Sequence, residues 1–209
     1  MFIPLVDALR CVNVHADTWL VASIERAEER DIKEGMLGCP NCLAEYPVRE
    51  GIVYFADREL GGELAMPVEE EAMRLAATLD LTDQRMTAVL HGGWGAHAQL
   101  VRSYSPAQLI LLNPPRGMVS GDGVSIVVSD LAPFAAASMH AAAIDASMND
   151  ETFASLRRAM RPGARLLAPA AMPLPDGFTE LARDEAVRVA RLDDASTVSA
   201  PVPLTRRPR

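Results

Sequence analysis

Short, mostly apolar segments recur along most of the chain and alternate with segments that repeat apolar residues at helical spacing. Strands are predicted at residues 87–91, 108–112, 125–128, 141–144, 165–168 and 186–192. Helices are predicted at residues 68–81, 96–103 and 149–160. Apolar strands joined by crossovers are typical of a parallel sheet that is covered on both faces. The pattern therefore predicts an α/β fold with a Rossmann-like, mostly parallel sheet and flanking helices.

The N-terminal part of the chain has a different pattern and contains all of the cysteines. Short strands are predicted at residues 19–24 and 52–55, with charged residues between them. Glycines and charges then indicate a linker. We expect a small β-rich module over residues 1–57, a linker over 58–68, a second domain over 69–195 and a disordered tail over 196–209.

The composition restricts the partners and the compartment. The net charge of −8 argues against binding nucleic acid through bulk charge, which requires a basic surface. No apolar run approaches the length of a bilayer span, and residues 1–7 lack the layout of a secretion signal. A Cys-x-x-Cys pair within a total of 3 cysteines is typical of metal or redox chemistry rather than disulfides. We expect a soluble, cytoplasmic protein without a membrane partner.

The cysteine pair carries the strongest local signal. Cys39 and Cys42 have the spacing that lets two thiolates bind one tetrahedral ion. Cys11 is the remaining cysteine, and His15 follows it at a distance that allows both to bind the same ion. These residues predict a structural zinc site with four protein ligands, which leaves no open position for catalysis. A ribbon that has lost its metal and a redox-active pair are the alternatives, although a redox pair is expected at the start of a helix.

This stretch resembles the small zinc-ribbon proteins that bind and activate methyltransferases, together with their short bacterial relatives. That family reads Leu-x-Cys-Pro-x-Cys, a hairpin, and then Cys-x-x-Cys-x-x-x-Tyr-Pro-Ile-x-x-Gly-Ile-Pro. Residues 9–11 match the first part and residues 39–52 match the second. Val14 stands where the family has its second cysteine, so the resemblance implies a zinc site in which His15 replaces that cysteine.

Residues 89–97 (VLHGGWGAH) place glycines where a predicted strand passes into a predicted helix. Glycines let a backbone approach a ligand closely, and the N–H groups at the start of a helix can bind an anion. A glycine is also common in such turns for conformational reasons alone. The turn becomes a candidate nucleotide site only in combination with further motifs.

Motifs in the expected order resemble class I S-adenosylmethionine-dependent methyltransferases over residues 68–192. Residues 89–97 resemble Val-Leu-Asp-x-Gly-x-Gly-x-Gly, residues 129–135 (SDLAPFA) resemble the acid and Leu-Pro-Phe after the third strand, and residues 156–166 (LRRAMRPGARL) resemble Arg-x-Leu-x-Pro-Gly-Gly-x-Leu before the fifth. The resemblance implies that S-adenosylmethionine binds at the residues that match these motifs or stand in their places: His91, Gly93, Gly95, His97, Asn113, Asp130 and Leu131.

The chain departs from the family pattern at residues expected to hold this cofactor. His91 replaces the acid of the first motif, His97 replaces its third glycine, and Asn113 replaces the acid that holds the ribose hydroxyls. A neutral hydrogen bond contributes about 1 kcal/mol and a charged one about 1.5–3 kcal/mol. The lost carboxylates are therefore expected to weaken binding by about one to two powers of ten. His91 and His97 could instead form a catalytic or metal-binding pair.

Two functions are compatible with these observations. The first is a degenerate, non-catalytic methyltransferase-like pseudoenzyme that carries a zinc ribbon and binds or scaffolds a partner, such as a methyltransferase or a second copy of itself. The second is an active S-adenosylmethionine-dependent methyltransferase with its zinc-ribbon activator in cis. Methyl transfer needs mainly the correct positioning of the two substrates, so no catalytic base can be named from the sequence. The lost acids and glycine favour the first. If the pocket beside residues 93–95 is open to Asn113 and Asp130, the enzyme is favoured. If His97 or Trp94 fills that pocket, the scaffold is favoured.

Overall fold

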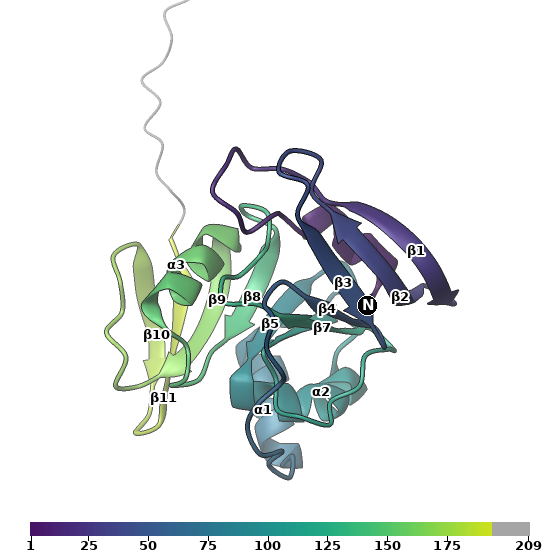
Figure 1. The fold of residues 1–209 in the computed structure, drawn as a ribbon. Helices are drawn as coiled ribbons and strands as arrows, with labels where there is room; N and C mark the ends of the chain where they lie inside the picture. Colours follow the sequence, from purple (N-terminus) through teal and green to yellow (C-terminus); the bar gives the residue numbers. More distant parts are fainter. Residues whose placement is uncertain (194–209) are drawn as a thin grey trace, which may run out of the picture.

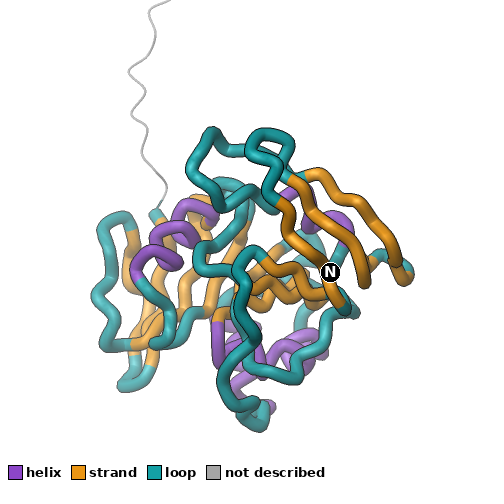
Figure 2. The backbone as a smooth tube through the Cα atoms, in the orientation of Figure 1, coloured by secondary structure: helices purple, strands orange, loops and turns teal. Residues whose placement is uncertain are grey.

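A computed structural model describes residues 1–193, which form a mixed sheet of eleven strands with helices on both faces (Figures 1 and 2). The strand order is β1-β2-β3-β4-β7-β6-β5-β8-β9-β11-β10. The predicted α/β class is confirmed, but the parallel arrangement is limited to the centre of the sheet. The predicted tail over residues 196–209 lies outside the described residues.

The N-terminal region is β-rich, as predicted. After a 3-10 helix at Ile3–Ala8, an antiparallel meander is formed by β1 (Val21–Glu28), β2 (Asp31–Gly38), β3 (Glu45–Arg49) and β4 (Ile52–Tyr54). The charged stretch that follows residue 24 belongs to β1. An edge strand can contain these charged residues because most of it is exposed and their side chains remain in water. Strand β4 then pairs in parallel with β7, so the meander continues the central sheet.

The parallel centre consists of the strands that continuous apolar patterns predict. They are β5 (Thr87–His91), β6 (Gln108–Leu112), β7 (Val124–Val128), β8 (Met139–Ala143) and β9 (Met160–Pro169). Strand β9 runs through the turn that Pro162 and Gly163 predict. At the far edge, β9 pairs with the antiparallel β11 (Val187–Leu192), which in turn pairs with β10 (Phe178–Arg183).

Helices cover the two faces of this centre. Helices α1 (Glu69–Thr78) and α2 (Ala98–Tyr104) lie on one face, and α3 (Asp150–Ala159) lies on the other (Figure 1). A 3-10 helix at Gly92–His97 precedes α2, and the Asn149 side chain caps α3 by accepting from the Thr152 N–H, as predicted. No helix in residues 1–193 is long and apolar enough to cross a membrane.

The central strand β5 marks the point where the chain order reverses. From β5 the chain moves outward through β6 and β7, and it then returns to the other side of β5 to form β8 and β9. In an open α/β sheet, the carboxyl ends of the two strands at such a switch point diverge and leave a crevice between them. The end of β5 and the end of β8 therefore frame the place where a ligand site is expected.

Candidate functional site

The four predicted metal ligands come together although they belong to two separate loops. Cys11 and His15 lie in the loop before β1, whereas Cys39 and Cys42 lie in the tight turn between β2 and β3. Their ligand atoms all lie within 4.8 Å of one another. Cys39 is buried, and Cys42 is at the surface. The sequence thus contains a Cys3His cluster near its N-terminus that is consistent with a structural zinc site.

The spacing of the donor atoms fits a tetrahedral zinc ion. The sulfur atoms of Cys11 and Cys42 are 3.6 Å apart, and Nε2 of His15 is 3.5 Å from the sulfur of Cys39. Zinc–sulfur bonds of about 2.3 Å and zinc–nitrogen bonds of about 2.0–2.1 Å give tetrahedral edges of about 3.8 Å between sulfurs and about 3.6 Å between sulfur and nitrogen. The distance between the Cys11 and Cys42 sulfur atoms is far longer than a disulfide bond of about 2.0 Å.

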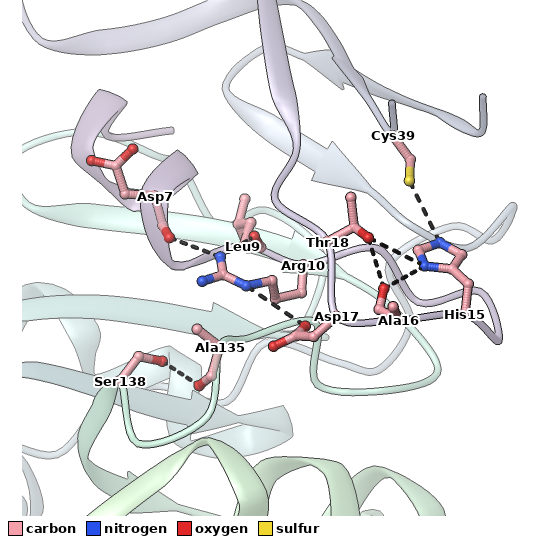
Figure 3. Close-up of polar contacts among 10 residues, drawn as sticks. All are labelled: Asp7, Leu9, Arg10, His15, Ala16, Asp17, Thr18, Cys39, Ala135 and Ser138. Atoms are coloured by element: carbon pink, nitrogen blue, oxygen red, sulfur yellow. Dashed lines mark hydrogen bonds and ion pairs between the residues drawn. The ribbon is translucent and has the colours of Figure 1, made fainter. Parts of the chain in front are cut away.

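Hydrogen bonds orient the imidazole of His15 toward Cys39 (Figure 3). Its Nδ1 lies 2.6 Å from the carbonyl oxygen of Ala16 and 3.4 Å from the hydroxyl of Thr18, so Nε2 faces Cys39. A backbone carbonyl that accepts from Nδ1 fixes the tautomer in which Nε2 can bind a metal. Val14, which occupies the position of the family's second cysteine, is fully exposed.

Two polar side chains contact the sulfur atoms from outside the cluster. The hydroxyl of Tyr46 lies 3.0 Å from the sulfur of Cys11, and the amide of Asn13 donates to the sulfur of Cys42 at 3.3 Å. Burial, together with the bond to Cys11, raises the pKa of Tyr46, so its hydroxyl stays protonated and can donate. The backbone N–H of Ala44 and the Asn13 amide lower the pKa of Cys42 to about 6. The sequence analysis assigned no role to Tyr46, although this residue matches the tyrosine of the Tyr-Pro pair in the zinc-ribbon motif.

The second candidate site is a cavity of about 500 Å³ at the carboxyl ends of the central strands. It lies at the switch point between β5 and β8, and the predicted linker forms part of its wall with residues 58–63. Four residues predicted to bind the cofactor line it, namely His91, Gly93, Asn113 and Asp130. The structure therefore brings these four together, while their role in binding S-adenosylmethionine stays a prediction.

The other three predicted residues lie elsewhere. A side chain at Gly95 would come within 2.8 Å of Cβ of Pro114, so this glycine is needed for close packing. His97 is buried, with Nε2 3.4 Å from a carboxylate oxygen of Glu71 on α1. Leu131 lines a separate cavity of about 190 Å³ beside Cys11 and His15.

The strongest polar network in the crevice is centred on Asp145, which sequence reasoning did not select. Its carboxylate accepts from the backbone N–H of Gly93 at 2.6 Å, from the hydroxyl of Ser147 at 2.6 Å, and lies 3.1 Å from Nδ1 of His91. Burial favours the neutral acid, but the bonds from His91, Ser147 and Gly93 outweigh it and hold the pKa of Asp145 well below its ordinary value. The sequence did contain one signal for Asp145, because it is an acidic residue that directly follows the predicted strand at residues 141–144.

Two further polar residues of the crevice, Asn113 and Asp130, are also bonded to the protein. Asn113, which has a left-handed backbone with φ of 53°, donates to the carbonyl of Ser129 at 2.8 Å and accepts from its N–H at 2.9 Å. Asp130 pairs with Arg58 of the linker segment at 3.4 Å. Trp94 does not line this cavity, because its indole N–H donates to the carbonyl of Ile144 and the ring packs against His97.

No protein-family model matches the sequence, and no curated protein matches it. The described residues are structurally similar to S-adenosylmethionine-dependent methyltransferases. A putative enzyme of this class from Methanococcus maripaludis has 10% identity and a TM-score of 0.46, with 62% of this chain and 86% of that chain covered. Geranyl diphosphate C-methyltransferase from Streptomyces coelicolor A3(2) has 16% identity and a TM-score of 0.39, with 47% and 44% covered. The chain spans 42–48% of the length of the geranyl diphosphate methyltransferases that it matches. Each likeness concerns the fold and extends to no ligand or activity of this chain.

Proposed function

We propose that this chain is a non-catalytic, methyltransferase-like binding module with a structural zinc ribbon in cis. The contact between the Gly93 N–H and the Asp145 carboxylate carries the proposal. An N–H at the start of a glycine turn is the group that would receive the anionic part of a nucleotide-like ligand. Here the chain supplies its own anion at that position.

The charge of Asp145 works against the placement of the S-adenosylmethionine carboxylate at the Gly93 N–H. Two unit charges of like sign about 4 Å apart repel by about 4 kcal/mol at an effective dielectric constant of 20. Asn113, which stands in for the ribose-binding acid, uses both ends of its amide on Ser129. These contacts support a crevice that does not hold the cofactor in the manner of the family.

The Cys3His cluster is assigned a structural zinc ion in this proposal. The donor spacing, the fixed tautomer of His15 and the outer hydrogen bonds from Tyr46 and Asn13 support it. Four protein ligands leave no position for a substrate. The ion would hold the loop before β1 against the turn between β2 and β3, and the module as a whole would bind a methyltransferase or a second copy of this chain.

An active methyltransferase is the second candidate, because the crevice reaches both Asn113 and Asp130 and is lined by neither Trp94 nor His97. Isothermal titration calorimetry of the zinc-loaded chain with S-adenosylmethionine and S-adenosylhomocysteine separates the two. The proposal expects no heat of binding near about 1 mM ligand. Binding in the micromolar range would reject it in favour of the enzyme. Metal analysis is expected to give one zinc per chain, and a metal-free preparation that rejects added zinc would overturn the assignment of the cluster.

A further inference from the structure

We infer that residues 58–63, within the loop that joins β4 to α1 (Figure 2), form a strap that opens as a unit and controls access to the crevice between β5 and β8. The inference goes beyond the proposed function, because it concerns entry to the crevice and applies to any ligand. Its evidence is the position of the strap between two cavities, the contacts that hold it and the two glycines within it.

The strap is a wall that two cavities share. Arg58, Glu59 and Leu60 line the crevice of about 500 Å³ and also line a second cavity of about 900 Å³. Arg49 of β3 and Tyr54 of β4 line the second cavity on its other side. Because the same three residues line both cavities, outward movement of the strap would join them into one groove. That groove would run from the N-terminal meander to the switch point at β5.

Arg58 holds the strap on the side of the crevice. Its Nη2 donates to the carbonyl of Ser129 at 3.1 Å, and its Nη1 lies 3.4 Å from a carboxylate oxygen of Asp130. Asp130 is one of the residues predicted to bind a cofactor, and here a cation of the chain itself compensates its charge. A ligand that needs Asp130 must therefore displace Arg58, which couples the entry of that ligand to the opening of the strap.

Arg116 holds the strap on the side of the second cavity. Its Nε donates to the carbonyl of Leu60 at 2.6 Å, and its Nη2 donates to the carboxylate of Glu59 at 3.0 Å. The side chains of this ion pair and of the Arg58 ion pair are all exposed. Exposed ion pairs contribute little stability and are weakened by salt. The contacts that keep the strap closed are therefore easily broken.

The backbone of the strap has few other restraints. No group of residues 1–193 makes a backbone–backbone hydrogen bond with residues 56–67. Apart from their chain neighbours, Gly61 and Gly62 have no heavy atom within 4 Å of the position that a Cβ would take, and Gly62 has a φ of 83°. Glycine adopts such a conformation at little cost, so this pair provides a hinge next to the arginine contacts. Leu60, which packs against the apolar cluster that includes α1 and α2, favours the return to the closed position.

Limited proteolysis of the zinc-loaded chain tests whether the strap opens as a unit. Arg116→Gln is assayed by trypsin cleavage after Arg58, and Arg58→Gln by cleavage after Glu59 with a glutamate-specific protease. The residue at the cleaved bond thus keeps its own ion-pair partner in each variant. Cleavage within a folded chain follows the population of the opened segment. Mass spectrometry of the two fragments is expected to show rates about threefold or more above wild type.

Arg74→Gln is the matched control. It removes an exposed ion pair with Asp184, and Arg74 lines neither cavity beside the strap. Both cleavage rates should stay at the wild-type level in this variant. Sodium chloride at about 0.5 M should bring the ratio of each strap variant to wild type closer to one, because salt screens the ion pair that the substitution removes. The ratio also cancels the response of the protease to salt.

Three results of the proteolysis would overturn the inference. Rates at the wild-type level in both strap variants would show that the arginine contacts do not hold a closed state. An equal rise in Arg74→Gln would show a general loss of stability. A rise in one strap variant alone would show that the two contacts break independently, so that the strap does not open as a unit.

Access to the crevice is measured separately by NMR with a neutral, soluble gadolinium chelate. The Ser129 N–H is the reporter, because Ser129 is 1% exposed and its carbonyl is bonded to Arg58. Its paramagnetic relaxation should rise about twofold or more in Arg116→Gln, which keeps Arg58, while that of the buried Leu90 N–H in β5 stays unchanged. Faster cleavage without a change at Ser129 would mean that the strap moves but does not control the crevice, which would overturn the inference. Neither measurement uses S-adenosylmethionine, so the outcome is independent of the proposed function.

Discussion

The backbone N–H of Gly93 lies 2.6 Å from Oδ2 of Asp145, which joins the glycine turn after β5 to the first acid after β8. These strands are neighbours in the sheet but lie about fifty residues apart in the chain. The same carboxylate lies 3.1 Å from Nδ1 of His91 and accepts from the hydroxyl of Ser147, so one side chain gathers three groups at one end of the crevice. In the proposed function, Asp145 is therefore the residue expected to decide which ligands the crevice takes.

Replacing Asp145 by alanine is expected to open the site to anionic groups. The substitution frees the Gly93 N–H and removes the negative charge, so the affinity for S-adenosylmethionine and S-adenosylhomocysteine should rise at least tenfold, or by about 1.4 kcal/mol. Calorimetry measures the change. Ser147→Ala is the matched control, because it removes one bond to Asp145 and keeps the carboxylate. Unchanged cofactor affinity in Asp145→Ala would show that Asp145 does not exclude the cofactor.

The lowered pKa of Asp145 predicts a specific contribution to acid stability. A carboxyl group with a folded-state pKa below its unfolded value of about 3.9 stabilises the protein above that value, and the contribution disappears as the pH falls toward the folded-state pKa. Asp145→Asn should lower the free energy of unfolding at pH 7 by about 1–3 kcal/mol, and the difference from wild type should shrink at about pH 3. Urea denaturation at both pH values checks this. A difference that is constant with pH would contradict it.

The two glycines of the same turn are predicted to differ. A methyl group at Gly95 meets Cβ of Pro114 at 2.8 Å, whereas at Gly93 the nearest neighbour is a carboxylate oxygen of Asp145 at 3.4 Å. Gly95→Ala should cost about 1–3 kcal/mol of stability through overpacking, and Gly93→Ala should cost less. Thermal denaturation of both variants measures this. Equal stabilities would show that the backbone at Pro114 moves to accommodate the methyl group.

The sequence predicts the centre of the fold better than its edges, for a physical reason. Strands β5 and β6 occur at the predicted residues because both of their faces are buried, and such strands are continuously apolar. Strands β2 and β10 were not predicted. Their polar residues face water on at least one side, and the neighbouring strands, rather than local composition, hold them in the sheet.

The same distinction applies to the two sites. The Cys3His cluster can be predicted from the chain because the Cys39–Cys42 spacing is local and the chain has only one other cysteine. The partner of Gly93 could not be predicted in this way, since it depends on which strand lies beside β5. Asp145 becomes its neighbour only through the reversal of strand order. The packing of Gly95 against Pro114 is equally a consequence of the folded arrangement.

The outer contacts of the metal cluster predict a loss of zinc affinity in Tyr46→Phe. The variant keeps the aromatic ring, which packs 4.4 Å from Phe55 between centroids, but it loses the hydroxyl that contacts Cys11. Loss of a hydrogen bond to a metal ligand typically costs about 10–100-fold in affinity. Competition with a chromophoric chelator measures the constant. Tyr54→Phe, in β4 and outside the cluster, is the control, and an equal loss in both variants would remove the role assigned to the hydroxyl.

Removal of the metal is expected to destabilise the whole chain rather than the N-terminal region alone. Cys39 belongs to one apolar cluster that includes Leu37 of β2, Val53 of β4, Ile110 of β6 and Leu156 of α3. Because this core is shared and β4 pairs with β7, the N-terminal strands and the parallel centre should unfold together. A chelator, or the variant Cys39→Ser, should lower the temperature of a single calorimetric transition by at least about 5 °C. Two separate transitions, of which only one responds to the chelator, would instead show that the zinc ribbon and the central sheet fold independently.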